Sequence, residues 1–483
     1  MNYKMIGKIT APILCIEVVF MIPALLIAQV NHDQNVVMAF TRTMIITLAV
    51  AGCLGLATRN AKKGFYAREG LVTTGLVWIV MSVLGCLPFY FSGEIPSFVD
   101  SLFETISGFT TTGSSILTDV EKMSRGLLYW RSFTHWVGGM GVLVFLLAIV
   151  PLSGKNEGYT LHILRAESPG PSVGKLVPRM RQTAMILYML YVILTVLDVL
   201  FLCAGGMPLF EAVCTAYGTA GTGGFGVKGD SIAGYSPYLQ NVTTVFMLLF
   251  GVNFSCYYLL LLKRVKDVLH DEELRTYVGI VLVSAILIAI NIRGLYTTLG
   301  ETLRLAFFQV ATIITTTGFA TADFNQWPAL SKTIMVLLMF CGACAGSTGG
   351  GIKVARLILL VKNFRRNMNQ NLHPTQVTTI RMNGQKVDEK IVSNVSAYLI
   401  GYMGIIVVSF LLVSLDNFSL ETNLTAVIAT FNNIGPGLDM IGPTGNFSAF
   451  SDLSKLVLSF DMLAGRLEIF PIVILLSRSV WKK

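Results

Sequence analysis

Long apolar runs follow one another along almost the whole chain, and they limit the fold more than any other feature of the sequence. Hydrophobic residues make up 53% of the 483 residues, charged residues make up only 13%, and the mean hydropathy is +0.67. A soluble domain carries about 25% charged residues. Because the apolar runs are continuous and do not alternate at period two, they predict membrane-spanning helices and not barrel strands. The sequence therefore predicts an all-α integral membrane protein.

About ten hydrophobic spans can be placed along the sequence, and the charges between them predict their orientation. Lys4 and Lys8 precede the first span, but this span is too long for the apolar region of a signal peptide, so we expect a retained helix. Lysine and arginine concentrate in alternate connections, which predicts that these connections and both termini are cytoplasmic. The net charge of +9 is explained by these connections and does not indicate nucleic-acid binding. The spans lie near residues 9–30, 36–57, 71–92, 126–151, 182–206, 236–263, 276–296, 328–362, 391–416 and 448–480.

Four glycine-centred stretches recur between these spans at intervals of about one hundred residues. Each follows an apolar segment of about ten residues, which is too short to cross a bilayer. Non-helical backbone at membrane depth is tolerated only where protein or a water-filled cavity covers it, so each segment is expected to be a half-helix that ends at a cavity. The stretches read SGFTTTGSS around Gly113, GTAGTGGFG around Gly223, IITTTGFAT around Gly318 and FNNIGPGLD around Gly435.

This repetition predicts a division of the chain into five parts. Residues 1–66 are expected to form two extra membrane helices. Each of the four repeats that follow is expected to contain a helix, a half-helix with its pore loop, and a second helix, arranged around one pseudo-four-fold pore. The predicted repeats are 67–153, 154–265, 266–366 and 367–483.

The composition of the four stretches favours a monovalent cation. Glycine accepts positive φ, which lets successive carbonyl groups point in one direction. Carbonyl oxygens can replace the hydration shell of an alkali cation, whereas a divalent ion would require carboxylates. The negative C-terminal ends of the half-helices would lower the cost of dehydrating that cation. Glu104 and Glu211 are expected at half-helix N-termini, where capping is favoured over attraction of ions.

A glycine-rich stretch, CGACAGSTGGGIK from Cys341 to Lys353, interrupts an apolar run. Each of its glycines weakens a helix by about 1 kcal/mol relative to alanine, so the helix is expected to break there. The stretch predicts an intramembrane gate; close helix packing through small residues is a compatible alternative. A phosphate-binding loop is disfavoured because the Gly-Lys-Ser/Thr order is missing. The expected gate residues are Gly346, Ser347, Thr348, Gly349, Gly350, Gly351 and Lys353.

One arginine, Arg466, lies inside the last apolar span. A buried arginine costs about 2.5–3.5 kcal/mol at a helix centre, so it is expected to face the pathway. Its predicted role is an electrostatic barrier or an anchor for the gate. The alternative is a salt bridge to Asp461 or Glu468. Cys341 and Cys344 form a CxxC pair, but without a second pair they are interpreted as structural.

Taken together, these motifs resemble the TrkH/KtrB superfamily of K⁺ uptake proteins, and its TrkH branch in particular. The resemblance covers nearly the whole chain and also includes HWVGGMG, GACAGSTGGGIKVAR, LHILRAESPGP and MLAGRLEIF, while the two extra helices favour the TrkH branch. It implies a filter that binds K⁺ through backbone oxygens. The fourth segment departs from the Thr-Gly pattern and continues with Pro436, so fewer well-formed ion sites are expected than in a symmetric tetramer. The filter residues implied are Thr111, Thr112 and Gly113; Gly221, Thr222 and Gly223; Thr316, Thr317 and Gly318; and Asn433, Ile434 and Gly435.

The resemblance also implies a setting for the protein. It implies K⁺ uptake through a bacterial cytoplasmic membrane, a homodimer, cytosolic TrkA-like nucleotide-binding subunits, and no organic cofactor in this chain. The basic segments Lys155–Arg181 and Lys362–Lys390 are candidate docking surfaces or lipid-headgroup contacts. Channel-like transport and coupling to H⁺ or Na⁺ (symport) both remain open. A Na⁺-selective or non-selective cation transporter is the alternative. A membrane enzyme is disfavoured because the sequence has no HExxH, GxSxG or intramembrane carboxylate cluster, and His135 is interpreted as a packing or hydrogen-bonding residue.

Overall fold

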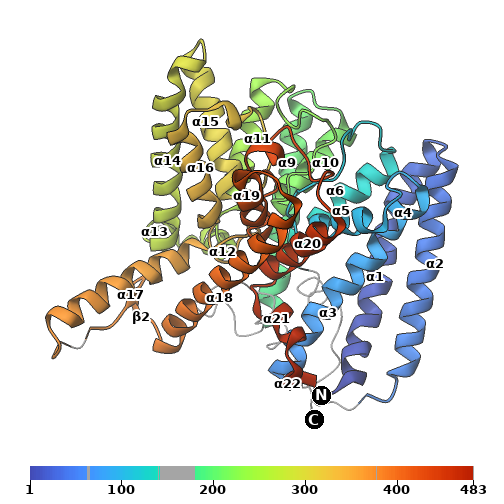
Figure 1. The fold of residues 1–483 in the computed structure, drawn as a ribbon, viewed down its shortest axis with the longest axis horizontal. Coiled ribbons are helices and arrows are strands. Elements are labelled where there is room, and N and C mark those ends of the chain that lie inside the picture. The colour runs from blue at the N-terminus through green and yellow to red at the C-terminus, as the bar shows by residue number, and fades with distance from the viewer. Residues whose placement is uncertain (62–65, 140, 142–179, 377, 482–483) are drawn as a thin grey trace.

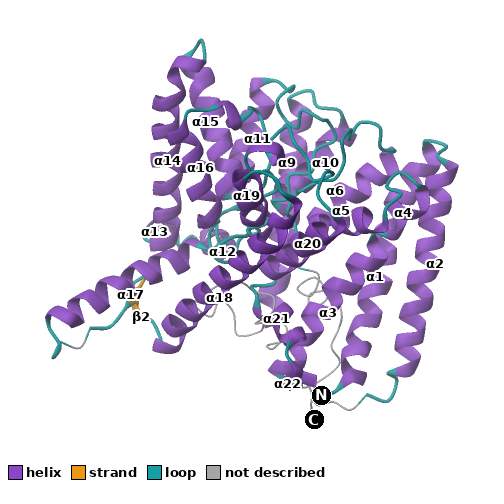
Figure 2. Cartoon of the chain, viewed as in Figure 1, coloured by secondary structure: helices purple, strands orange, loops and turns teal. Residues whose placement is uncertain are grey.

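Helices make up most of the computed structural model of the chain (Figures 1 and 2). The structure describes residues 1–61, 66–139, 141, 180–376 and 378–481. Most of the predicted docking segment Lys155–Arg181, the LHILRAESPGP motif and the end of the first repeat lie outside these residues. The strands found in the described part are Arg381–Met382 (β1) and Gln385–Lys386 (β2), which pair antiparallel. The prediction of an all-α membrane fold is therefore confirmed.

Two long helices, α1 (Tyr3–Val30) and α2 (Gln34–Ala57), precede the first repeat and stand together at one side of the molecule (Figure 1). The outward faces of these helices and of several later ones carry exposed leucine, isoleucine and valine side chains. Exposed apolar surface of this extent suits contact with lipid. The two chain ends lie together, and the rings of Tyr3 and Trp481 stack with 6.3 Å between their centres.

Each repeat places a half-helix between longer helices. The first repeat comprises α3 (Ala67–Gly85), α4 (Leu87–Ser92), the half-helix α5 (Phe98–Phe109) and α6 (Arg125–Gly139). The second comprises α9 (Met180–Ala204), the half-helix α10 (Leu209–Gly221), α11 (Pro237–Phe250), α12 (Phe254–Leu261) and α13 (Val265–Leu269).

The third and fourth repeats follow the same plan. The third comprises α14 (Glu272–Ile292), η1 (Arg293–Leu295), the half-helix α15 (Leu299–Ile314), η2 (Phe324–Gln326), α16 (Ala329–Cys341) and α17 (Val354–Leu372). The fourth comprises α18 (Glu389–Val413), η3 (Ser414–Asp416), the half-helix α19 (Leu420–Phe431), η4 (Asp439–Ile441), α20 (Asp452–Arg466), α21 (Phe470–Leu476) and α22 (Arg478–Trp481).

Local sequence explains where three of the half-helices begin. Ser97, Thr298 and Ser419 precede α5, α15 and α19, and each side chain accepts a hydrogen bond from a backbone N–H in the first turn. Such N-caps satisfy donors that have no partner inside the helix. The half-helix α10 instead begins after Pro208. All four half-helices are largely buried, as expected for segments that dip into the membrane without crossing it.

The second helices of the second, third and fourth repeats are interrupted, and this corrects part of the span prediction. The spans predicted at 236–263, 328–362 and 448–480 are not continuous helices. A bend of 88° separates α11 from α12 at Gly251–Asn253, where the Asn253 side chain caps α12. Only the break at the glycine-rich stretch between α16 and α17 was predicted. Within the described residues six helices can cross a bilayer by length and composition, or seven if the bent pair counts as one span.

Candidate functional site

The four half-helices end in the same backbone motif. In the first, the Thr111 N–H donates to the carbonyl of Gly108 at 3.0 Å, and the Thr112 N–H donates to that of Ser107 at 2.8 Å. The other three ends repeat both bonds, as in a Schellman motif. The residue with left-handed φ in this motif is usually glycine, but here it is threonine or asparagine. These residues are Thr111 (54°), Thr222 (54°), Thr316 (58°) and Asn433 (57°).

A second left-handed residue follows two positions later and fixes the register of the four segments. These residues are Gly113, Gly224, Gly318 and Gly435, with φ between 78° and 93°. The second segment is therefore Thr222-Gly223-Gly224, one residue further along than predicted. Gly221 is the last residue of α10, and it directly precedes the left-handed residue Thr222. Two adjacent glycines allow either alignment in the sequence, and only the backbone angles separate them.

These four glycines meet the neighbouring segments in a closed ring. A Cβ atom on each glycine would lie closer than 3.0 Å to a carbonyl oxygen of the next segment, so the ring excludes side chains there. The fourth segment closes on the first. The contacts run from Gly113 to the oxygen of Gly223, from Gly224 to that of Thr317, from Gly318 to that of Ile434, and from Gly435 to that of Thr112. Four equivalent carbonyl groups from distant parts of the chain therefore surround one centre.

A cavity of about 140 Å³ lies against this ring and is lined by all four glycines. Its lining also includes Arg131 and Lys228, and no acidic side chain of the described residues belongs to it. Groups of three or more His, Cys, Asp or Glu side chains that could hold a metal ion are likewise missing from the described part of the chain. The oxygens offered to a cation at the ring are thus neutral backbone oxygens.

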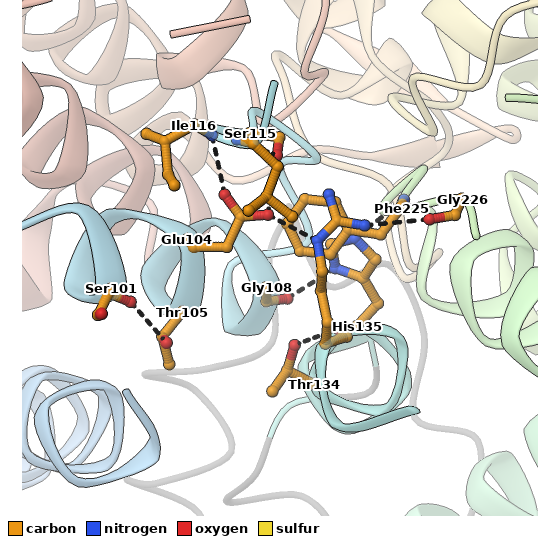
Figure 3. A network of polar contacts seen from close by, with 12 residues as sticks. Ser101, Glu104, Thr105, Gly108, Ser115, Ile116, Thr134, His135, Phe225 and Gly226 are labelled. Atoms are coloured by element: carbon orange, nitrogen blue, oxygen red, sulfur yellow. Dashed lines mark hydrogen bonds and ion pairs between the residues drawn. The ribbon is translucent and has the colours of Figure 1, made fainter. Parts of the chain in front are cut away.

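A buried ion pair behind the first segment connects it to the second (Figure 3). Glu104 accepts hydrogen bonds from Arg131 Nε at 2.6 Å, Ser115 Oγ at 2.9 Å and the Ile116 N–H at 2.9 Å. Arg131 donates to the Gly226 carbonyl at 3.1 Å, and its guanidinium lies 3.5 Å from the ring centre of Phe225. These contacts connect the residues that follow the first segment to those that follow the second.

This ion pair corrects the role expected for one glutamate. Glu104 is the seventh residue of α5 and not at its N-terminus, where Asp100 occupies the first turn. Glu211 does lie in the first turn of α10, as predicted, where it pairs with Lys228 at 3.7 Å. Sequence analysis missed Arg131 because the arginine is 27 positions from its partner, so no local pattern connects the two.

The only histidine expected at membrane depth, His135, supports the second segment. The Phe225 N–H donates to His135 Nε2 at 3.2 Å, which assigns the ring proton to Nδ1. His135 Nδ1 then donates to the Gly108 carbonyl at 2.7 Å. A Cβ on Gly223 would overlap the imidazole ring. The ring is therefore packed and hydrogen-bonded, as predicted, and it positions the backbone of the second segment.

In the fourth segment, the asparagine that departs from the threonine pattern makes a bridge. Asn433 Nδ2 donates to Thr112 Oγ1 at 2.9 Å and to the Met462 carbonyl at 2.9 Å. The side chain thus connects the fourth segment to the first segment and to α20.

The glycine-rich stretch forms a non-helical loop, so the predicted break in the helix is confirmed. This loop, residues 342–353, is called the glycine loop below. The Gly350 N–H donates to Thr316 Oγ1 at 2.6 Å, and a Cβ on Gly350 would lie 2.5 Å from the Asn432 carbonyl oxygen. The loop therefore touches the third and fourth segments where their half-helices end. Lys353, which is buried, donates to the Gly349 carbonyl.

Arg466 joins the glycine loop to the first repeat. Its guanidinium donates to the Thr348 carbonyl at 2.7 Å and to the carbonyls of Gly138 and Gly139 at 2.6 and 2.9 Å. The two acids considered as partners contact other groups: Glu468 pairs with Arg356, and Asp461 accepts a hydrogen bond from Ser409. The geometry is that of an anchor between the loop and the end of α6.

Comparisons with known proteins agree with this geometry. The sequence profile of the TrkH family, described as cation transport protein, matches residues 36–483. The Trk system potassium uptake protein TrkH of Salmonella typhimurium is 34% identical over the full length of both chains, and TrkG of Escherichia coli is 31% identical over 96% of this chain and 95% of its own. The crystal structure of the potassium transporter TrkH from Vibrio parahaemolyticus superimposes with a TM-score of 0.88 at 30% identity, covering both chains completely.

Proposed function

Because this chain belongs to the TrkH family of cation transport proteins, we propose that it takes up K⁺ across a bacterial cytoplasmic membrane. The observation that carries this proposal is the closed ring of carbonyl oxygens contributed by four segments. Relatives that match the full length are named potassium uptake proteins. The family is one of transporters, so the alternative of a membrane enzyme is set aside.

In this proposal the ring is the selectivity filter. The carbonyl oxygens of Thr112, Gly223, Thr317 and Ile434 replace water around a dehydrated K⁺ ion. Four half-helices end at the ring, so their negative C-terminal ends stabilise the ion further. Neutral oxygens favour a weakly hydrated monovalent ion, whereas a divalent ion would require carboxylate ligands. Gly224 takes the position that sequence analysis gave to Gly223, and Gly221 is left out of the proposed filter.

The glycine loop and Arg466 are proposed as the gate. The loop lies against the third and fourth segments, where it would obstruct an ion leaving the ring. The Arg466 guanidinium adds a positive charge on the same side and fixes the loop through Thr348. Ions would pass when these contacts break. Gly346, Ser347, Gly349, Gly350, Gly351 and Lys353 would move with the loop.

A homodimer is proposed from α17. This helix projects from the body of the molecule (Figure 1), and Phe364 on it is 65% exposed. Val361, Met368 and Leu372 are also exposed and share a face with Phe364, because they lie three or four positions apart. A helical face of this kind, extending away from its own chain, suits burial against a second copy.

The remaining proposals concern setting and regulation. We infer that both termini are cytoplasmic. The positive-inside rule places connections rich in lysine and arginine in the cytoplasm, and the predicted order of spans puts both termini on the same side of the membrane as these connections. Cytosolic nucleotide-binding subunits of the TrkA type would act on the gate; support comes from the family resemblance and from the basic residues between Lys362 and Lys390. The division into residues 1–66, 67–153, 154–265, 266–366 and 367–483 is retained as the proposed repeat organisation.

The direct test is ion uptake by the purified protein in liposomes. Uptake of Rb⁺, a K⁺ analogue, should be inhibited by added K⁺ and little affected by equal Na⁺. Equal inhibition by both ions would favour the non-selective alternative, and stronger inhibition by Na⁺ would favour a Na⁺ transporter. No uptake by well-folded protein, with or without a pH or Na⁺ gradient, would contradict the proposal.

A further inference from the structure

A single carboxylate oxygen holds both ends of the glycine loop. Glu273, the second residue of α14, is 5% exposed. Its Oε1 atom accepts a hydrogen bond from the Ala345 N–H at 2.6 Å and another from the Ala355 N–H at 3.0 Å. Ala345 lies near the start of the loop, and Ala355 is in the first turn of α17, just beyond its end. The carboxylate therefore fixes the distance between the two ends.

The same contact supplies a cap that α17 does not have locally. Lys353 is at the N-cap position of α17, and its side chain makes no capping hydrogen bond. A carboxylate at a helix N-terminus satisfies free N–H groups and is stabilised by the helix dipole. Glu273 provides this from a different helix. Loss of its oxygen would leave two buried N–H groups without their acceptor, which favours rearrangement of the loop.

The start of α14 is also connected to the segments beyond the glycine loop. Glu272 pairs with Lys362 on α17 and accepts a hydrogen bond from the Asn383 N–H at 3.2 Å. Asp271 accepts a further one from Asn383 Nδ2 at 2.8 Å. Asn383 forms the turn between β1 and β2. A displacement of α17 or of this hairpin would therefore act on the residues that carry Glu273.

We propose that Glu273 is a positioning residue that keeps the glycine loop in its obstructing position, and that the start of α14 transmits displacement of α17 and the β1–β2 hairpin to the loop. The middle of the loop is held by Thr316 and Arg466, and its ends are held by Glu273. This inference rests on the proposed function, because it assigns a control point to the proposed gate.

The test compares Glu273→Ala with Glu273→Gln in the liposome uptake assay, without added partner proteins. Glutamine keeps a side-chain oxygen that can accept both N–H groups, whereas alanine removes it. We expect Glu273→Ala to raise maximal Rb⁺ uptake by about tenfold, the order expected when hydrogen bonds to a charged acceptor are lost. The half-saturating K⁺ concentration and the preference for K⁺ over Na⁺ should not change. Glu273→Gln should stay within about twofold of the parent rate.

A matched control is Asp267→Ala, which removes an exposed carboxylate of α13 that pairs with Arg264. Its uptake should equal that of the parent. If Glu273→Ala elutes as a folded protein and transports at the parent rate, the inference is wrong. It is also wrong if Glu273→Gln is as active as Glu273→Ala, or if selectivity is lost. A parent protein that does not transport would instead contradict the proposed function.

A double variant gives a second readout that does not depend on one substitution. Glu273 and Arg466 contact the same loop, so their effects on the uptake rate should be non-additive. We expect Glu273→Ala combined with Arg466→Ala to transport little faster than the faster single variant. Fully multiplicative rates would show that the two residues act on separate elements and would overturn the inference.

Discussion

Replacing Gly318 by alanine places a methyl group in the carbonyl ring, and its consequence can be worked out from the structure. Gly318 has a φ of 88°, and a left-handed conformation costs a non-glycine residue about 1–2 kcal/mol. The added Cβ would also lie closer than 3.0 Å to the Ile434 carbonyl oxygen. Overpacking of this kind costs about 1–3 kcal/mol. The total strain is therefore about 2–5 kcal/mol, and moving the Ile434 carbonyl out of the ring relieves it.

We expect this displacement to remove one of the four ligands from the proposed ion site. Rb⁺ uptake into liposomes should fall by tenfold or more, because about 1.4 kcal/mol of lost ion stabilisation corresponds to a factor of ten. The preference for K⁺ over Na⁺ should fall with it. Gly404→Ala is the matched control: Gly404 lies in the membrane helix α18, and its added Cβ would meet no atom within 4 Å. This control should transport as the parent does.

The reasoning fails if the folded Gly318→Ala protein transports Rb⁺ at the parent rate with parent selectivity. That result would mean that the Ile434 carbonyl is not part of the ion path. A fall in rate shared equally by Gly404→Ala would also count against it, since the effect would then not be specific to the ring.

Four further results are expected. Arg466→Ala should raise basal Rb⁺ uptake, because the glycine loop loses its anchor to the first repeat; a lower rate would contradict this. Glu104→Gln should lower the melting temperature far more than Glu211→Gln, since removing one partner of a buried ion pair costs about 3–5 kcal/mol and the Glu211 pair is partly exposed. Equal shifts would refute the difference in burial. Hydrogen bonds from Ser419 and then Thr422 hold the pKa of Asp439 below its ordinary value of 3.8. The stabilising contribution of the Asp439 carboxylate is therefore present above pH 3.8 and is lost as the pH falls through the lowered pKa. The difference in melting temperature between the parent and Asp439→Asn should accordingly disappear only in strong acid. Phe364→Glu should shift the purified protein from dimer to monomer in light scattering, and an unchanged mass would exclude α17 as the interface.

Hydropathy and glycine placement were sufficient to predict the class of fold and the general position of the site. The apolar spans predict helices because a bilayer leaves the backbone no other hydrogen-bond partners. The short segments before Gly113, Gly318 and Gly435 could be identified as half-helices by length alone. The break between Cys341 and Lys353 follows from helix propensity. All of these features are local, so neighbouring residues carry the necessary information.

Register and contacts between repeats were decided only by the tertiary structure. Sequence could not distinguish Gly223 from Gly224, because either glycine accepts the required φ and only packing against Thr317 selects one. The bend between α11 and α12 was also missed, since both pieces are equally apolar.

The partners of the buried charged residues were also decided only by the tertiary structure, because these partners are far apart in the sequence. Glu104 pairs with Arg131 across 27 residues, Arg466 donates to Gly138 across 328 residues, and Glu273 accepts from Ala345 across 72 residues. No periodicity in the sequence encodes such pairs. They form because a charge or a free N–H inside a membrane protein must find a partner, and folding determines which distant group lies within reach.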